Sequence, residues 1–134
     1  MATDIQARGA RLSRLWILIA VCYLIVGVVF GIGMAASNQF QFVPVHAHVN
    51  LLGWATMALA GLIYDRYPLA GGSRLGVLHF WSYNIVLPLL MAGLIFMFAG
   101  HPEMEPLMIA GSIGMLASLL VFAVNLFMNL RTTA

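Results

Sequence analysis

Four long hydrophobic segments without charged residues alternate with short segments that carry every charge in the chain. They cover residues 15–36, 43–64, 75–99 and 106–130. An α-helix needs about 20 apolar residues to cross ~30 Å of hydrocarbon, and each segment supplies them. Because the connections are short, successive helices should be antiparallel neighbours. The pattern predicts one all-α transmembrane domain over residues 1–134, built as an up-down-up-down four-helix bundle.

Composition places the chain in the lipid bilayer. Of the 134 residues 63% are hydrophobic and 7% charged, with a mean hydropathy of +0.99, which excludes a water-soluble domain. Arginines occur in the N-terminal arm, in the 65–73 connection and at the C-terminus, whereas Glu103 and Glu105 lie in the opposite connection. Arginine collects in cytoplasmic loops, so both termini should be cytoplasmic. No cluster of basic residues with interleaved aromatics indicates nucleic acid as a partner.

Polar side chains open the second hydrophobic segment, where His46, His48 and Asn50 precede an apolar run. Ionisable groups at the mouth of a membrane span are costly and usually serve a ligand or a proton. At helical spacing, His46 lies on a stripe of polar or small residues that comprises Asn50, Gly53, Met57, Ala60 and Tyr64. The stripe of His48 is apolar. Residues two apart point to nearly opposite sides, so a regular helix favours His46 as the inward imidazole.

A third histidine is expected at the same depth. His101 ends the third segment, which runs antiparallel to the second, so His46, His48 and His101 can meet near the external face. Together they would form a copper or zinc site. His79 lies roughly 30 Å away, at 1.5 Å per residue, beside Trp81 near the cytoplasmic start of the third segment. We interpret it as an interfacial or hydrogen-bonded residue.

Two segments resemble a known family. The second segment contains His48-Val49-Asn50-Leu51-Leu52-Gly53-Trp54, followed by Ala60-Gly61-Leu62-Ile63-Tyr64. This pattern is similar to the second helix of the catalytic subunit of haem-copper oxidases and nitric oxide reductases. The third segment contains Phe80-Trp81-Ser82-Tyr83-Asn84-Ile85-Val86-Leu87-Pro88, which is similar to the third helix of that family. The chain resembles only the front part of such a subunit, so it should not reduce oxygen by itself.

The resemblance implies a b-type haem near the external face and a role in electron transfer. One axial nitrogen would come from His46 or His48: the spacing in the reductases selects His48, and the longer spacing in the oxidases selects His46. Asn50 would hydrogen-bond the ligand or a propionate, Gly53 would let the porphyrin approach, and Met57 would line the site. The second ligand would be His101, a methionine or the histidine of a second subunit, which makes a homo-oligomer expected.

Other functions stay open at this point. They are a copper or zinc protein, a gas- or ligand-sensing haem protein, and a cofactor-free accessory subunit whose polar stripe packs against a larger membrane partner. The expected location is the inner membrane of a bacterium. No nucleophile triad, phosphate loop or paired intramembrane carboxylate indicates a hydrolase or a transferase.

Overall fold

The computed structural model describes residues 2–130, and every regular element in that range is helical. The elements are α1 (Ala2–Ala36), the 3-10 turn η1 (Phe40–Phe42), α2 (Val43–His48), the π-helical η2 (Val49–Thr56), α3 (Met57–Arg66), α4 (Pro68–Gly71), α5 (Arg74–Phe98), the 3-10 turn η3 (Pro102–Met104) and α6 (Glu105–Asn129). Elements η1 to α3 follow one another without a break and form a single rod.

Four of these rods are long and apolar enough to cross a membrane: Ala2–Ala36, Phe40–Arg66, Arg74–Phe98 and Pro102–Asn129. The expectation of an all-α, multi-pass membrane chain is confirmed at this level. Helix α1 begins well before the predicted span, because the charged arm around Arg8 and Arg11 consists of good helix formers and continues the same helix.

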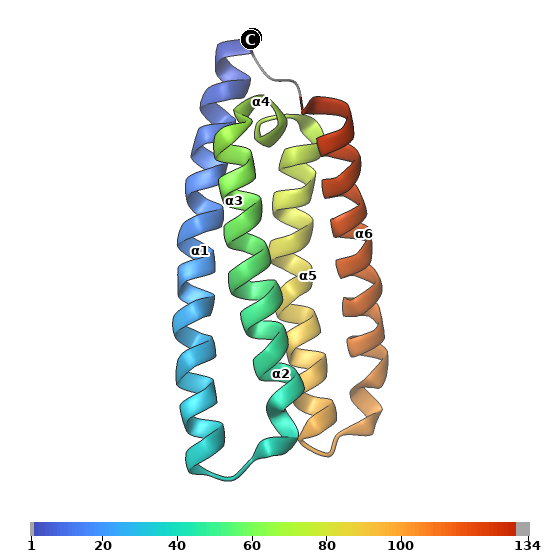
Figure 1. Ribbon diagram of the computed structural model, residues 1–134. Helices are drawn as coiled ribbons and strands as arrows, with labels where there is room; N and C mark the ends of the chain where they lie inside the picture. The colour runs from blue at the N-terminus through green and yellow to red at the C-terminus, as the bar shows by residue number, and fades with distance from the viewer. Residues whose placement is uncertain (1, 131–134) are drawn as a thin grey trace.

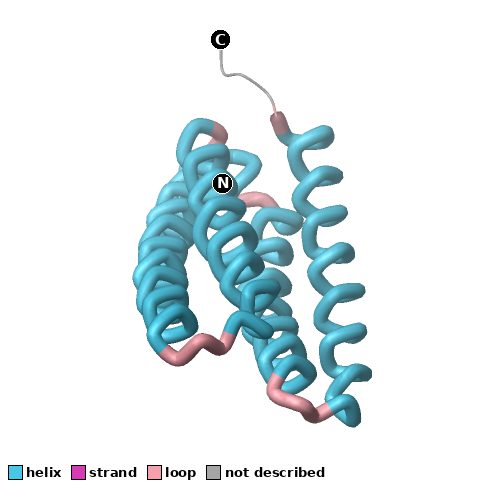
Figure 2. The backbone as a smooth tube through the Cα atoms, turned by 60° about the horizontal axis from the view of Figure 1, so that its bottom comes forward, coloured by secondary structure: helices cyan, strands magenta, loops and turns pink. Residues whose placement is uncertain are grey.

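The rods lie side by side and are joined at alternate ends (Figure 1). Helix α1 packs against the second rod, and α5 packs against α6. The turn after α1 and the turn after α5 lie at the same end of the molecule (Figure 2). The opposite end holds the start of α1, the α4 connection and the end of α6, and it carries the described arginines: Arg8, Arg11, Arg14, Arg66 and Arg74. We call it the arginine end.

Glycine allows α5 and α6 to approach backbone to backbone. A Cβ atom added at Gly93 would lie 2.6 Å from the Cα atom of Met108, and one added at Gly111 would lie 2.7 Å from the Cα atom of Leu90. Small residues at such crossings are typical of membrane helices, which associate through close packing and not through the hydrophobic effect.

The second rod contains an uncommon stretch of π-helix. Over Val49–Thr56 the backbone widens, and two hydroxyl groups bond to its carbonyls. Tyr83 Oη donates to the Leu52 carbonyl at 3.0 Å, and Thr56 Oγ1 donates to the Leu51 carbonyl at 2.8 Å. π-helical segments are rare and often occur at functional sites. This one directly follows the two histidines, and the hydrophobic pattern gave no sign of it.

Candidate functional site

The side chain of His46 lies against α1. A Cβ atom added at Gly31 would be 2.8 Å from His46 Cε1, and one added at Gly27 would be 2.6 Å from Asn50 Oδ1. Asn50 Nδ2 donates to the His46 carbonyl at 2.8 Å and lies 3.4 Å from His46 Nδ1. The space left by the α1 glycines is therefore filled by these two side chains, which leaves no gap for a porphyrin between α1 and α2.

The remaining stripe residues also face the protein interior. A Cβ atom added at Gly53 would be 2.6 Å from Tyr23 Cδ1, so the ring of Tyr23 occupies the position at which we expected a porphyrin to approach. Met57 is fully buried in the core. The stripe is the packing face of the second rod toward α1, and Gly53 and Met57 have packing roles in this arrangement.

His48 has a different environment. It is half-buried, and its Nδ1 atom lies 2.7 Å from the Pro44 carbonyl oxygen. A carbonyl only accepts hydrogen bonds, so Nδ1 donates and carries a proton. In the neutral ring this leaves the lone pair on Nε2. Metal-ligating histidines almost always hold one ring N–H on a carbonyl or carboxylate in this way, which orients the ring.

His101 is exposed at the same end of the molecule as the other two. Its Nδ1 atom lies 3.0 Å from Glu103 Oε1, and both side chains face solvent. Within the described part of the chain, no group of three or more His, Cys, Asp or Glu side chains is placed to hold a metal ion. His46, His48 and His101 thus do not come together in one copy, and the copper or zinc alternative has no geometric basis there.

A buried histidine lies toward the arginine end. His79 is 1% exposed, and its ring lies between Trp16 and Phe122, with centroid distances of 4.8 and 4.7 Å. Of the two interpretations of His79, the hydrogen-bonded residue is confirmed and the snorkelling interfacial residue is not, because the ring is buried inside the protein. It belongs to the inward face of α5 together with Tyr83, because positions four apart share one side of a helix.

Hydrogen bonds connect His79 to three other polar residues. Tyr64 Oη lies 2.9 Å from His79 Nδ1, and Asn125 Nδ2 donates to Tyr64 Oη at 3.1 Å and to the Ala70 carbonyl at 3.0 Å. Asn125 Oδ1 accepts from Ser73 Oγ at 2.8 Å. We call Tyr64, Ser73, His79 and Asn125 the buried polar cluster. It joins α3, the α4 connection, α5 and α6.

The direction of the bond between Tyr64 and His79 depends on the tautomer of His79. Tyr64 Oη accepts from Asn125, and it either donates its O–H to His79 Nδ1 or accepts from that nitrogen, according to which ring nitrogen of His79 carries the proton. His79 Nε2 and Trp16 Nε1 are buried without a hydrogen-bond partner among the described residues. One signal in the sequence indicates the cluster: Gly111, Ser118 and Asn125 recur every seven residues in an apolar span, which marks an inward face.

The chain matches none of the protein-family models, curated proteins or solved structures with which it was compared. Its function is therefore argued from its own residues. Two features are available for this: the half-buried ring of His48, oriented by the Pro44 carbonyl, and the buried polar cluster, whose bonds are nearly all made inside the protein.

Proposed function

We propose that this chain is a bacterial inner-membrane protein that binds b-type haem through His48 and takes part in electron transfer. The hydrogen bond between His48 Nδ1 and the Pro44 carbonyl is the observation that carries the proposal. It orients the ring and, in the neutral imidazole, leaves the lone pair on Nε2, the form in which a histidine binds iron. The orientation proposed is up-down-up-down with both termini cytoplasmic, because the described arginines share one end.

His48 suits this role better than His46. Both histidines are half-buried, but the ring of His46 lies against α1 at Gly31 and beside Asn50. His48 lies on another side of the same helix, and its ring is oriented by the hydrogen bond from Nδ1 to the Pro44 carbonyl. The resemblance to the nitric oxide reductases supports the same residue, since their spacing also selects His48.

A haem at His48 would lie outside the bundle of one copy. Leu51, one turn from His48, is 64% exposed, and Leu59, farther along the same rod, is 59% exposed, so the second rod has apolar side chains that are uncovered in a single chain. In a symmetric dimer the side of the second rod that carries His48 contacts the same side of the rod in the other chain, which brings the two copies of His48 to one site. Each chain would contribute one imidazole and an apolar wall that excludes water. Bound haem would supply a one-electron redox centre, which bis-histidine ligation favours over oxygen chemistry.

An optical spectrum of the purified protein tests the proposal. We expect a sharp Soret band and split visible bands on reduction, with about one haem per two chains, as bis-histidine sharing requires. His48→Ala should abolish the spectrum, whereas His46→Ala and His101→Ala, the matched controls at the same end, should keep it. A colourless protein, with or without copper or zinc, contradicts haem binding. Loss of the spectrum in His46→Ala alone contradicts the assignment to His48.

A further inference from the structure

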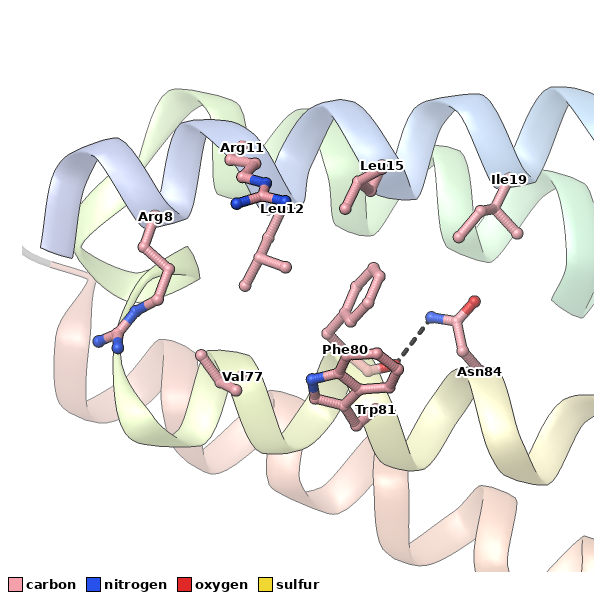
Figure 3. A pocket seen from close by; sticks show the side chains of 9 residues that line it. All are labelled: Arg8, Arg11, Leu12, Leu15, Ile19, Val77, Phe80, Trp81 and Asn84. Carbon is pink, nitrogen blue, oxygen red and sulfur yellow. Dashed lines mark hydrogen bonds between the residues drawn. The ribbon is translucent and has the colours of Figure 1, made fainter. Parts of the chain in front are cut away.

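A groove lies between α1 and α5 near the arginine end, far from His48 (Figure 3). Its volume is about 560 Å³. Leu12 and Leu15 form one wall and Phe80 and Trp81 form the other, while Arg8 and Arg11 lie at its mouth. Helices α1 and α5 make few direct contacts, since each packs mainly against another rod, and the groove occupies the space between them.

The groove extends from a charged mouth into an apolar body. Its lining on α1 runs from Arg8 to Ile19, and the apolar part from Leu12 to Ile19 is roughly 10 Å long at 1.5 Å per residue, about two thirds of the hydrocarbon thickness of one leaflet. Asn84 lies at the inner end, where its Nδ2 atom donates to the Phe80 carbonyl at 2.8 Å (Figure 3). The groove can therefore hold the part of an acyl chain that is nearest to its headgroup.

The mouth carries a net positive charge. The guanidinium group of Arg8 is oriented by a hydrogen bond from Nε to the Gly72 carbonyl at 2.9 Å. A neighbouring hollow shares Arg8 and adds Arg74, with Asp4 as the opposing acidic group. The two adjoining hollows thus carry three arginines and one carboxylate, which are Arg8, Arg11, Arg74 and Asp4. Arginine binds phosphate through several N–H groups in a planar fork, so the opening suits a phosphate better than an uncharged headgroup.

We propose that this groove binds one anionic phospholipid of the leaflet on the arginine side. Its phosphate contacts Arg8 and Arg11, and one of its acyl chains lies along Leu12, Leu15 and Phe80. Basic pockets between transmembrane helices on the cytoplasmic side recognise acidic headgroups by the same charge complementarity. The site is independent of haem binding, because it lies at the opposite end of the bundle and shares no residue with the surroundings of His48.

Native mass spectrometry of the delipidated protein in detergent tests this site. The probes are a diacyl phosphatidylglycerol, a phosphatidylcholine with the same chains, and glycerol phosphate without chains. We expect one phosphatidylglycerol to bind at least tenfold more tightly than phosphatidylcholine, with no binding of glycerol phosphate. Arg8→Gln and Arg11→Gln should each weaken it about fivefold, the effect of one basic residue near an anionic lipid surface.

Two kinds of control keep the test decisive. Arg14→Gln and Arg66→Gln remove the same charge at the same end outside the groove, and they should leave the affinity unchanged. Leu15→Trp keeps every charge and fills the body of the groove, so it should also displace the lipid. If Arg8→Gln unfolds because the bond to Gly72 is lost, the Arg11 and Leu15 variants carry the test. Equal losses in all four arginine variants, equal binding of phosphatidylcholine, binding of glycerol phosphate or full binding by Leu15→Trp would each overturn the proposal.

Discussion

Replacing Asn125 by leucine should remove much of the polar connection between three of the rods at the arginine end. Its amide makes four hydrogen bonds, to Tyr64, Ala70, Ser73 and Asn129. Leucine is close to asparagine in size and fits an apolar span, so the change removes the bonds without leaving a large cavity. Three of the four partners lie on segments other than α6. The loss therefore acts on the packing between rods.

The expected loss of stability follows from the free energies measured for hydrogen bonds between membrane helices. At about 0.6 kcal/mol each, the three bonds that leave α6 give roughly 1.8 kcal/mol, which is about a twentyfold change in the unfolding equilibrium constant. Two of the former partners of Asn125 keep other hydrogen bonds in the variant, which prevents a larger loss of stability. The Ala70 carbonyl still accepts from the Ser73 N–H at 3.3 Å, and Tyr64 Oη keeps its hydrogen bond with His79 Nδ1. We therefore expect a destabilised protein that still folds.

Titration with sodium dodecyl sulphate in mixed micelles, followed by circular dichroism, measures the effect. The matched control is Asn84→Leu, because the amide of Asn84 makes a single bond to a carbonyl of its own helix. The midpoint should shift several times more for Asn125→Leu than for Asn84→Leu. In a double-mutant cycle, Tyr64→Phe should couple to Asn125→Leu but not to Asn84→Leu. Equal shifts for the two asparagines, or no coupling with Tyr64, would refute the argument that the buried polar cluster holds the rods together.

Two more changes test other contacts. Gly93→Ala should cost about 1–3 kcal/mol, because the new methyl group would meet the Cα atom of Met108 at 2.6 Å, whereas Gly33→Ala meets nothing within 4 Å and should be neutral or slightly stabilising. The same detergent titration measures both variants. Equal shifts of the unfolding midpoint would contradict backbone-to-backbone packing of α5 and α6. Tyr83→Phe removes the bond to the Leu52 carbonyl and should speed amide hydrogen exchange in residues 49–56 more than in 57–66. Unchanged exchange in 49–56 would show that this hydroxyl does not hold the π-helix.

The four spans could be predicted from the sequence because charge and hydrophobicity alone set their limits. The second span was expected over 43–64 and extends over Phe40–Arg66. The side of His46 also follows from its spacing to Asn50 and Gly53. What spacing could not show is that α1 fills that side, since the closeness of two helices depends on glycines of the partner, such as Gly31. An inward position therefore indicated packing and not an open site.

The buried polar cluster was missed for a different reason. His79 was judged by its distance from the other histidines and by its aromatic neighbours along the chain, which say nothing about the face it occupies. Its partners Tyr64 and Asn125 come from segments 15 and 46 residues away from it, so no local pattern joins them. Only the packing of three rods brings the hydroxyl, the amide and the imidazole together.

The π-helix of the second rod makes the angular position of the histidines depend on chain length. Each residue of an α-helix turns the chain by about 100°, and a π-helical turn holds one residue more than α-helical geometry allows. Deleting one residue from Val49–Thr56 would restore the α-helical hydrogen-bond pattern. The residues that precede this segment would then rotate about the helix axis relative to α3. His46 would turn away from Gly31, although neither histidine had changed. The length of this segment thus decides which imidazole lies against α1.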